Sequence, residues 1–284
     1  MHWKLKASIQ NLVGALPPRA SRAAYQFLQR RFGRLQEFDP FPWLAAARET
    51  CELIREQGRS PEGRTFLEIG TGWVPLMPMA YWLQGAKRTI SIDLNPYLKD
   101  TLIDECLRNM AGREAEVRET LGNSLREERL AALLALVTDG QVTRQAFLAL
   151  CRIDYRSGVD AARTGLANGS VDFHCSHTVL EHIAPDLISG VLEEGNRIVR
   201  SEGLFVHRVD YTDHFSHTDA GISAINFLRF SEEEWSRYAD NRFMYMNRLR
   251  HDDMLERFAA AGHQVLSVET HVDRELQSVI EQGG

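Results

Sequence analysis

Two glycines and two acids stand at spacings that suit a nucleoside ligand. The stretch FLEIGTGWVPLMP, residues 66–78, is an apolar run that ends in Gly70 and Gly72, and Glu68 stands two residues before the first glycine. Asp93 follows 21 residues after Gly72, at the end of a second apolar run. In a doubly wound sheet such loops lie beyond the carboxyl ends of the strands, where an acid can accept both hydroxyls of a ribose. The spacing therefore predicts a nucleotide-type site.

Two common phosphate-binding patterns do not fit this loop. Pro75 stands where the dinucleotide pattern G-x-G-x-x-G requires its third glycine. The Gly-Lys pair of a P-loop is absent from the sequence. Pro75 instead suits the first turn of a helix, because proline needs no amide partner there. A pyrophosphate ligand is thus disfavoured.

Alternating apolar and helical patterns position these residues. The apolar runs predict strands over 64–70, 88–95, 151–157, 170–177, 203–210 and 263–270. Helical spacing between and around them predicts helices over 43–57, 74–85, 97–110, 187–200 and 252–262. Strands that alternate with helices require crossover connections. We therefore predict an α/β fold with a doubly wound, Rossmann-like and mostly parallel sheet.

Three segments lie outside this alternation. Residues 1–60 predict an N-terminal helical arm or lid, and 61–284 would form the ligand-binding domain. About 111–150 is helical throughout and predicts an inserted helical element. About 211–250 is polar, aromatic and rich in His and Asp, and we interpret it as a substrate loop.

The N-terminal arm is basic and the remainder is acidic. Through residue 34 there are seven Lys and Arg and no acid, so a net charge of −6 leaves −13 on the rest. Two amphipathic helices are predicted on either side of Pro17 and Pro18, and we expect their apolar stripes to pack on the protein. The alternative is peripheral contact of residues 1–34 with an anionic membrane. Nucleic acid is an unlikely partner for an acidic body without a basic stripe.

The composition indicates where in the cell the protein is expected. At 284 residues and 44% hydrophobic, the chain is typical of a globular protein. No apolar run approaches the ~20 residues of a membrane span, and no secretory signal is evident. The four cysteines are scattered, so we expect buried, reduced thiols. These features predict a cytoplasmic protein, with the inner membrane surface as the alternative, and they do not indicate an oligomeric state.

The ordered motifs resemble a known family. LEIGTGW and SIDLNP are similar to motifs I and II of class I S-adenosylmethionine (SAM) dependent methyltransferases. VDAARTGLANGSVDFHCSHTVLEHI, residues 159–183, is similar to the third and fourth motifs, and RIVRSEGLFVHRVD resembles the fifth strand. The resemblance covers about residues 62–270. It implies S-adenosyl-L-methionine as cofactor and a methyltransferase activity.

The resemblance also implies roles for individual residues. Glu68 would stabilise the loop and the methionine end, Gly70 and Gly72 would allow close backbone approach, and Asp93 would bind the ribose. Asp160 and Ala161 would contact the adenine. Val74 departs from the family pattern, which has a third glycine there. The full predicted cofactor site is Glu68, Gly70, Thr71, Gly72, Trp73, Asp93, Leu94, Asp160, Ala161 and Ser176.

The methyl acceptor would bind beyond the fourth and fifth strands. A hydroxyl acceptor needs a base, and His177, His207 and His214 are candidates with pKa values in a useful range. Acceptor-binding residues are predicted in the polar loop, where Asn and Arg near aromatic rings suit sugar hydroxyls or anions: Asp210, Asp213, Asn226, Arg229, Asn247 and Arg248. A looser resemblance, to bacterial methyltransferases of polysaccharide or secondary biosynthesis, implies a hydroxyl or amine of a sugar, glycolipid or secondary metabolite.

The sequence leaves three alternatives open: a metal site, a different SAM-dependent reaction and a non-catalytic role. The spacing H-x-x-D-x-x-D-H-x-x-H over 207–217 is able to supply a metal with two imidazoles and a carboxylate, but we favour a solvated substrate loop and predict no metal. His182 is interpreted as a helix residue bonded to a neighbour. The chain is alternatively a SAM-using enzyme of the same fold that transfers the aminocarboxypropyl chain or cyclises a substrate, or a non-catalytic adaptor.

Overall fold

The computed structural model describes residues 1–33, 35, 36, 38–270 and 277. The chain divides into two compact units. Unit 1 comprises Met1–Gln36, Leu180–Ile188 and Val209–Gly284, and unit 2 comprises Glu37–Val179 and Ser189–Arg208. Packing therefore does not follow the division at residue 60 that the sequence suggested, because the third helix belongs to unit 2.

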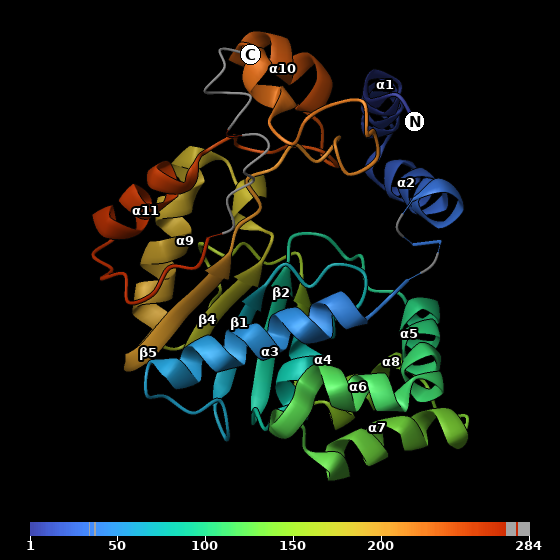
Figure 1. Ribbon diagram of the computed structural model, residues 1–284, viewed down its shortest axis with the longest axis vertical. Helices are drawn as coiled ribbons and strands as arrows, with labels where there is room; N and C mark the ends of the chain where they lie inside the picture. The colour runs from blue at the N-terminus through green and yellow to red at the C-terminus, as the bar shows by residue number, and fades with distance from the viewer. Residues whose placement is uncertain (34, 37, 271–276, 278–284) are drawn as a thin grey trace. The chain divides into compact units, whose positions relative to one another are not determined.

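Unit 2 contains a five-stranded parallel sheet (Figure 1). The strands are β1 (Thr65–Ile69), β2 (Arg88–Asp93), β3 (Ile153–Ser157), β4 (Val171–His177) and β5 (Val199–Arg208). Their order is β3-β2-β1-β4-β5, so the chain reverses direction between β1 and β4. Right-handed crossovers on either side of such a reversal place helices on opposite faces of the sheet. The doubly wound, Rossmann-like fold is thus confirmed.

Helices of unit 2 cover the sheet and form the insertion. They are α3 (Phe41–Glu56), α4 (Leu76–Leu83), α5 (Asp100–Gly112), α6 (Glu114–Leu121), η1 (Gly122–Ser124), α7 (Glu127–Thr138) and α8 (Arg144–Leu150). Every residue of α4 is buried, which agrees with its apolar sequence and with its contacts to α3 and the sheet. Helices α6 to α8 fall within the predicted insertion. In Figure 1, α3 crosses in front of the strands.

Unit 1 contains the N-terminal helices and most of the C-terminal part. Its elements are α1 (Trp3–Gly14), α2 (Pro18–Phe32), η2 (Leu180–His182), η3 (Asn226–Arg229), α10 (Glu232–Ala239) and α11 (His251–Ala260). Helix α9 (Pro185–Ile198) begins in unit 1 and continues into unit 2.

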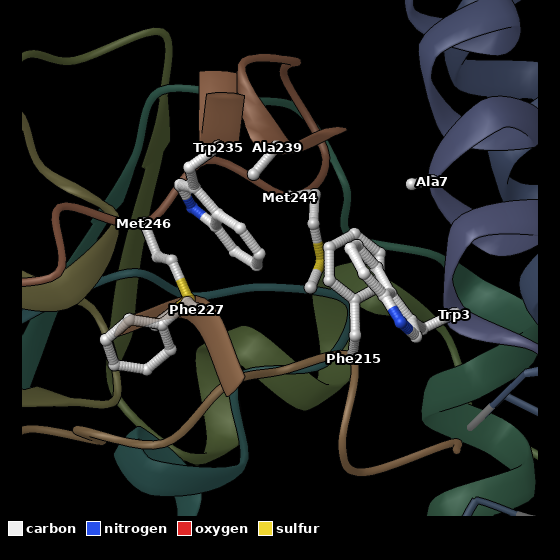
Figure 2. Packing of buried hydrophobic residues seen from close by; sticks show 8 residues of the cluster. All are labelled: Trp3, Ala7, Phe215, Phe227, Trp235, Ala239, Met244 and Met246. Atoms are coloured by element: carbon white, nitrogen blue, oxygen red, sulfur yellow. The ribbon is translucent and has the colours of Figure 1, made fainter. Parts of the chain in front are cut away.

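An aromatic cluster forms the core of unit 1. Trp3 and Ala7 of α1 pack with side chains that come from the segment between residues 215 and 246 (Figure 2). The ring centroids of Trp3 and Phe215 are 5.4 Å apart, and those of Trp3 and Tyr238 are 4.8 Å apart. The amide of Trp3 also donates to Asp219 Oδ2 at 2.7 Å. The expected packing of the two apolar stripes is thus confirmed only in part. Trp3, Ala7 and Val13 of α1 are buried, whereas Leu5 and Leu12, and Phe27 and Phe32 of α2, are exposed.

Two sequence predictions of secondary structure were wrong. Residues 263–270 form no strand, and Val265, Leu266 and Val268 are about half exposed, because no strand of the described chain pairs with them. Helix α10 was not predicted. Its start carries a capping box in which the Ser231 hydroxyl accepts from the Glu234 amide and the Glu234 carboxylate accepts from the Ser231 amide. That spacing is visible in the sequence.

Two predictions about composition can also be compared with the structure. All four cysteines are free and buried, as expected. Among the described residues, no helix is both long and apolar enough to cross a membrane.

Candidate functional site

The loop after β1 turns sharply at Gly70. Gly70 has φ of 88°, and a Cβ added there would lie 2.4 Å from Val179 Cγ2, so only glycine fits. Its amide donates to the Ile92 carbonyl of β2 at 2.8 Å. These contacts fix the loop against the neighbouring strand.

Gly72 and Asp93 are joined directly. The Gly72 amide donates to Asp93 Oδ2 at 2.9 Å, and the Asn95 amide donates to Oδ1 at 2.7 Å. Burial raises the pKa of Asp93, although these two amides oppose that shift. Gly72 has φ of 65°, and nothing lies within 4 Å of a Cβ built on it. The loop therefore presents an open backbone surface beside an acid, as a ligand that binds close to the backbone requires.

Glu68 lies behind this loop in a buried polar chain. Ser91 Oγ donates to Glu68 Oε2 at 2.6 Å, and the Thr71 and Ser91 hydroxyls are 2.7 Å apart. All three residues are buried, and burial raises the pKa of Glu68 to about 7. Glu68 thus supports the loop through Ser91 and Thr71. Ser91, which sequence reasoning missed, is the residue that connects them.

Trp73 and Val74, which depart from the family pattern, occupy different environments. The Trp73 ring is half-buried and lies 4.8 Å from the Tyr97 ring, while the Val74 side chain is buried. Leu94 is 68% exposed beside Asp93. Val74 therefore packs in the core, and Trp73 forms an aromatic pair next to the loop. Tyr97 carried no signal in the sequence that marked it as a partner.

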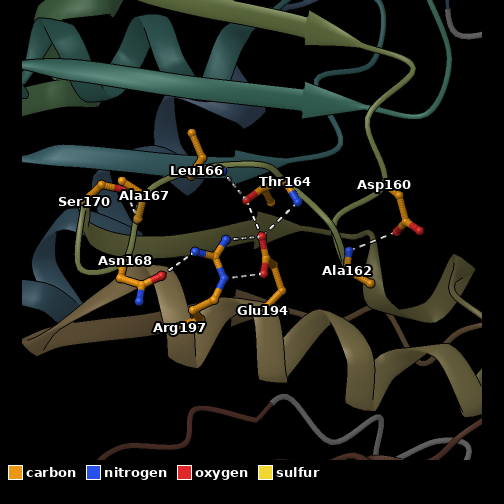
Figure 3. A network of polar contacts seen from close by, with 9 residues as sticks. All are labelled: Asp160, Ala162, Thr164, Leu166, Ala167, Asn168, Ser170, Glu194 and Arg197. Carbon is orange, nitrogen blue, oxygen red and sulfur yellow. Dashed lines mark hydrogen bonds and ion pairs between the residues drawn. The ribbon is translucent and has the colours of Figure 1, made fainter.

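The segment predicted to bind adenine is braced from α9 (Figure 3). Exposed Asp160 accepts the Ala162 amide on Oδ1 at 2.9 Å, and Ala161 is buried. Further along, Glu194 Oε1 accepts from the amide and hydroxyl of Thr164 at 2.9 and 2.5 Å. Hydrogen bonds from Arg197 lower the pKa of Glu194 to about 2. The charged Glu194 therefore holds the 160–170 loop in place.

At the ends of β4 and β5, Ser176 and two histidines form a chain of contacts. Ser176 Oγ lies 2.7 Å from His207 Nδ1, and His207 Nε2 lies 3.1 Å from His174 Nδ1. Both ring nitrogens of His207 are therefore engaged within the sheet. His177, the last residue of β4, is half-buried and its Cα pairs with that of Arg208. His174 is buried and was not identified from the sequence.

Most of the predicted acceptor-binding residues make contacts within unit 1. Asp213 is buried, and its carboxylate accepts from the Asn226 amide group at 3.0 Å and the Phe215 amide at 2.8 Å. Asn247 Nδ2 donates to the carbonyls of Leu180 and Ile183, each at 2.8 Å.

The two arginines that were predicted to bind an acceptor lie in different environments. Arg248 donates to the carbonyls of Phe227 and Phe230, each at 2.8 Å, and also contacts Glu232. Arg229 is exposed at the end of η3. Asp213, Asn226, Asn247 and Arg248 thus maintain the loop, and their role toward an acceptor stays a prediction.

A separate group of acids and histidines gathers in unit 1. Asp210 Oδ2 lies 3.4 Å from His214 Nε2 and 3.6 Å from His217 Nε2. Glu181 and His182 of η2 lie beside His214, with one potential ligand atom of each residue within 4.8 Å of the others. His182 Nδ1 bonds to the Tyr245 carbonyl, in line with the predicted bond to a neighbour. No spacing in the sequence marks Glu181 as a member of this group.

Comparisons with known proteins find similarity only among solved structures. No protein-family model matches the chain, and no curated protein matches it. A "putative O-methyltransferase" from Nostoc punctiforme is 13% identical, with 91% of this chain and 62% of that chain covered and a TM-score of 0.46. A SAM-dependent methyltransferase from Mesorhizobium loti is 14% identical, with 81% and 88% covered and a TM-score of 0.44.

A third similar structure contains a cofactor product. It is phosphoethanolamine N-methyltransferase 1 of Haemonchus contortus in complex with phosphoethanolamine and S-adenosylhomocysteine, which is 12% identical with a TM-score of 0.37. The match covers 69% of this chain and 34% of that chain. This chain thus spans about a third of that protein. We transfer no residue role from these structures.

Proposed function

We propose that this protein is a SAM-dependent methyltransferase that acts on a hydroxyl or amine of a small molecule. The observation that carries the proposal is the bond between the Gly72 amide and Asp93, which joins the glycine loop to an acid on the next strand. In a doubly wound fold this is the place for the ribose of a nucleoside ligand. The glycine loop follows one strand and Asp93 ends the next strand. Turn geometry alone does not explain why the loop and the acid meet.

The residues present suit SAM better than a dinucleotide. The backbone at Gly72 faces open space, where a side chain would obstruct a ligand. Pro75 stands where a dinucleotide loop has its third glycine, and SAM has no pyrophosphate to bind. Asp93 keeps further lone pairs for ribose hydroxyls beyond the two amides that it accepts. Trp73 and Tyr97 add an aromatic surface beside the loop.

SAM, when bound, would supply an electrophilic methyl group, so the protein's task is chiefly positioning. Glu68, Ser91 and Thr71 hold the loop, Asp93 orients the ribose, and the braced 160–170 loop borders the adenine. The acceptor must approach in line at about 3 Å, and a hydroxyl acceptor also needs a base. Among the histidines of unit 2, we favour His177 for that role, because it is the last residue of β4 at the carboxyl end of the sheet, where ligands of this fold bind. The His207 ring contacts Ser176 and His174.

The acceptor class is the finer part of the proposal. A sugar, glycolipid or secondary metabolite would suit the polar, aromatic segment 211–250. Exposed apolar side chains on the basic N-terminal helices, Leu5, Leu12, Phe27 and Phe32, support peripheral contact with an anionic membrane and hence a lipid-linked acceptor.

Calorimetry with SAM and with S-adenosylhomocysteine tests the cofactor assignment. We expect micromolar binding of both ligands to the full chain, and the absence of heat with either ligand would refute it. Incubation with SAM and a panel of sugars and glycolipids then tests the reaction. S-adenosylhomocysteine is the expected product. Methylthioadenosine would indicate aminocarboxypropyl transfer, and binding without turnover of any acceptor would favour the adaptor alternative.

A further inference from the structure

The side chains of two histidines and a glutamate in unit 1 lie close together, and no other role explains this arrangement. Glu181 and His182 lie on the short turn η2, and His214 lies 32 residues further along the chain. One ligand atom from each residue lies within 4.8 Å of the other two. We propose that Glu181, His182 and His214 bind a divalent transition-metal ion. This proposal does not depend on the methyl-transfer proposal, and it differs from our sequence-based prediction of no metal.

Glu181 provides the strongest reason. Its side chain is 2% exposed, and neither carboxylate oxygen has a hydrogen-bond partner among the described residues. Burial of an unpaired carboxylate costs several kcal/mol, so such groups are normally paired or coordinate metals. The two imidazoles lie near the carboxylate, and so do the backbone amides of Glu181 and Asp210. A cation held jointly by the carboxylate and the two imidazoles would satisfy it.

His182 is oriented as a metal ligand. Its Nδ1 lies 2.6 Å from the Tyr245 carbonyl, which can only accept, so Nδ1 carries the hydrogen. The lone pair of the neutral ring is then on Nε2. Metal-bound histidines commonly donate their other ring N–H to a carbonyl in this way. The turn itself is fixed, because the Asn247 amide donates to the Glu181 carbonyl at 2.8 Å.

His214 completes the group and connects it to Asp210. The His214 ring lies 4.9 Å from the His182 ring and 5.1 Å from the His217 ring. Its Nε2 is buried and lies 3.4 Å from Asp210 Oδ2.

Asp210 is itself held in place. Its Oδ1 accepts from the amide and hydroxyl of Thr212 at 2.8 and 2.6 Å. With neutral imidazoles, Glu181 and Asp210 together carry the charge that a divalent ion would neutralise.

The ligand set identifies the class of ion. Imidazole nitrogens suit zinc, copper, iron and nickel, whereas magnesium and calcium prefer sites built of oxygens alone. Two histidines and one carboxylate form a three-ligand set, which leaves at least one coordination position open. Exposed His182 gives the ion access from solvent, while Glu181 is buried. We therefore expect zinc or a similar ion and little affinity for magnesium.

The experiment uses the full chain, free of any affinity tag and stripped with a chelator. Cobalt(II) serves as the probe, because its visible d–d bands report coordination, and zinc binding is measured by calorimetry. We expect one ion per chain, with Glu181→Gln and His214→Ala each weakening binding by at least about tenfold. Glu256→Gln and His263→Ala remove the same chemical groups elsewhere in unit 1 and should leave binding unchanged.

Several outcomes would overturn the proposal. They are no stoichiometric binding by the wild type, equal losses in the control variants, or magnesium binding as tight as zinc. Circular dichroism of the metal-free variants checks that they fold. In the wild type, saturating zinc should also raise the melting temperature, since a ligand that binds only the folded state stabilises it. That shift should be lost in Glu181→Gln.

Discussion

The Gly72 amide donates to Asp93 across 2.9 Å, and this bond ties the loop after β1 to the end of β2. Because Gly72 lies in the loop after β1 and Asp93 ends β2, and the two strands are adjacent and parallel, the sheet brings the residues together. The carboxylate therefore has two tasks in our proposal. It shapes the loop through Gly72 and Asn95, and it remains able to accept ribose hydroxyls.

Asp93→Ala should abolish cofactor binding. The change removes the acceptor of two amides as well as the proposed ribose ligand, and hydrogen bonds to charged groups contribute about 1.5–3 kcal/mol each. We expect affinity for S-adenosylhomocysteine to fall by at least a hundredfold in calorimetry, from about two such bonds. Asp154→Ala on β3, whose partners are Arg88 and Arg156, is the matched control. Equal affinity in both variants would contradict the assignment.

Gly70→Ala and Gly72→Ala should fail in different ways. A Cβ at Gly70 meets Val179 Cγ2 at 2.4 Å, so we expect about 1–3 kcal/mol of destabilisation in chemical denaturation. Val179→Ala should recover part of this loss. A Cβ at Gly72 meets nothing within 4 Å, so its stability cost should be limited to backbone strain while cofactor affinity falls. Unchanged affinity in Gly72→Ala would argue against a ligand that approaches this backbone.

Glu68 should make stability depend on pH. Burial raises its pKa from 4.5 to about 7, so between these values the folded state holds a proton that the unfolded state has released. The contribution of Glu68 to the free energy of unfolding should therefore fall as pH rises from about 4.5 to 7 and level off above this range. Glu68→Gln should reduce the slope of the whole protein without abolishing it, because burial also raises the pKa of Asp93 and of Glu181. Denaturation at several pH values measures both slopes, and parallel curves would contradict the prediction.

His177→Gln should lower turnover more than His207→Gln. A general base contributes about 10²–10⁴-fold, and glutamine preserves the size of the side chain but removes the basic nitrogen. His207 already contacts Ser176 and His174, so we expect its substitution to act mainly on stability. Once an acceptor is found, kcat for both variants decides between them. The reverse order would make His207 the base.

Membrane contact is better tested by point substitution than by deletion. Removing residues 1–34 would take Trp3 out of the unit 1 core, and loss of a buried aromatic side chain costs about 3–5 kcal/mol. Leu12 and Phe27 are 73% and 64% exposed, so Leu12→Asp and Phe27→Asp should fold normally. We expect both to reduce sedimentation with anionic vesicles. Exposed Leu187→Asp serves as the control, and binding that is equal in all variants would exclude this surface.

The sequence predicted the sheet well because its signals are local. Apolar runs ending in Gly70 and Asp93 marked the ends of two strands, and the strand order then placed them together. The same local signal wrongly predicted a strand over residues 263–270, where the described chain has no neighbouring strand for it to pair with. The capping box at Ser231 is visible in the sequence, but the helix that it begins was not predicted.

The unit 1 residues were harder to predict because they meet through irregular backbone. Glu181 and His214 are brought together by turns without periodicity, so no spacing rule relates them. The histidines over 207–217 suggested one metal-binding set, yet His207 contacts Ser176 and His174 within the sheet. The side chains of Asp213 and Asn226, which we predict to bind an acceptor, also bond to each other. Burial of polar side chains cannot be seen in the sequence.

The chain passes between the two units at four places, so neither unit is an uninterrupted polypeptide. A fragment ending at Arg208 would carry Met1–Gln36 and Leu180–Ile188 without the C-terminal part of unit 1. The carbonyls of Leu180 and Ile183 would then lose Asn247, and buried Leu180 would lose its surroundings. Cutting the chain at this boundary should therefore destabilise the segment Leu180–Ile188.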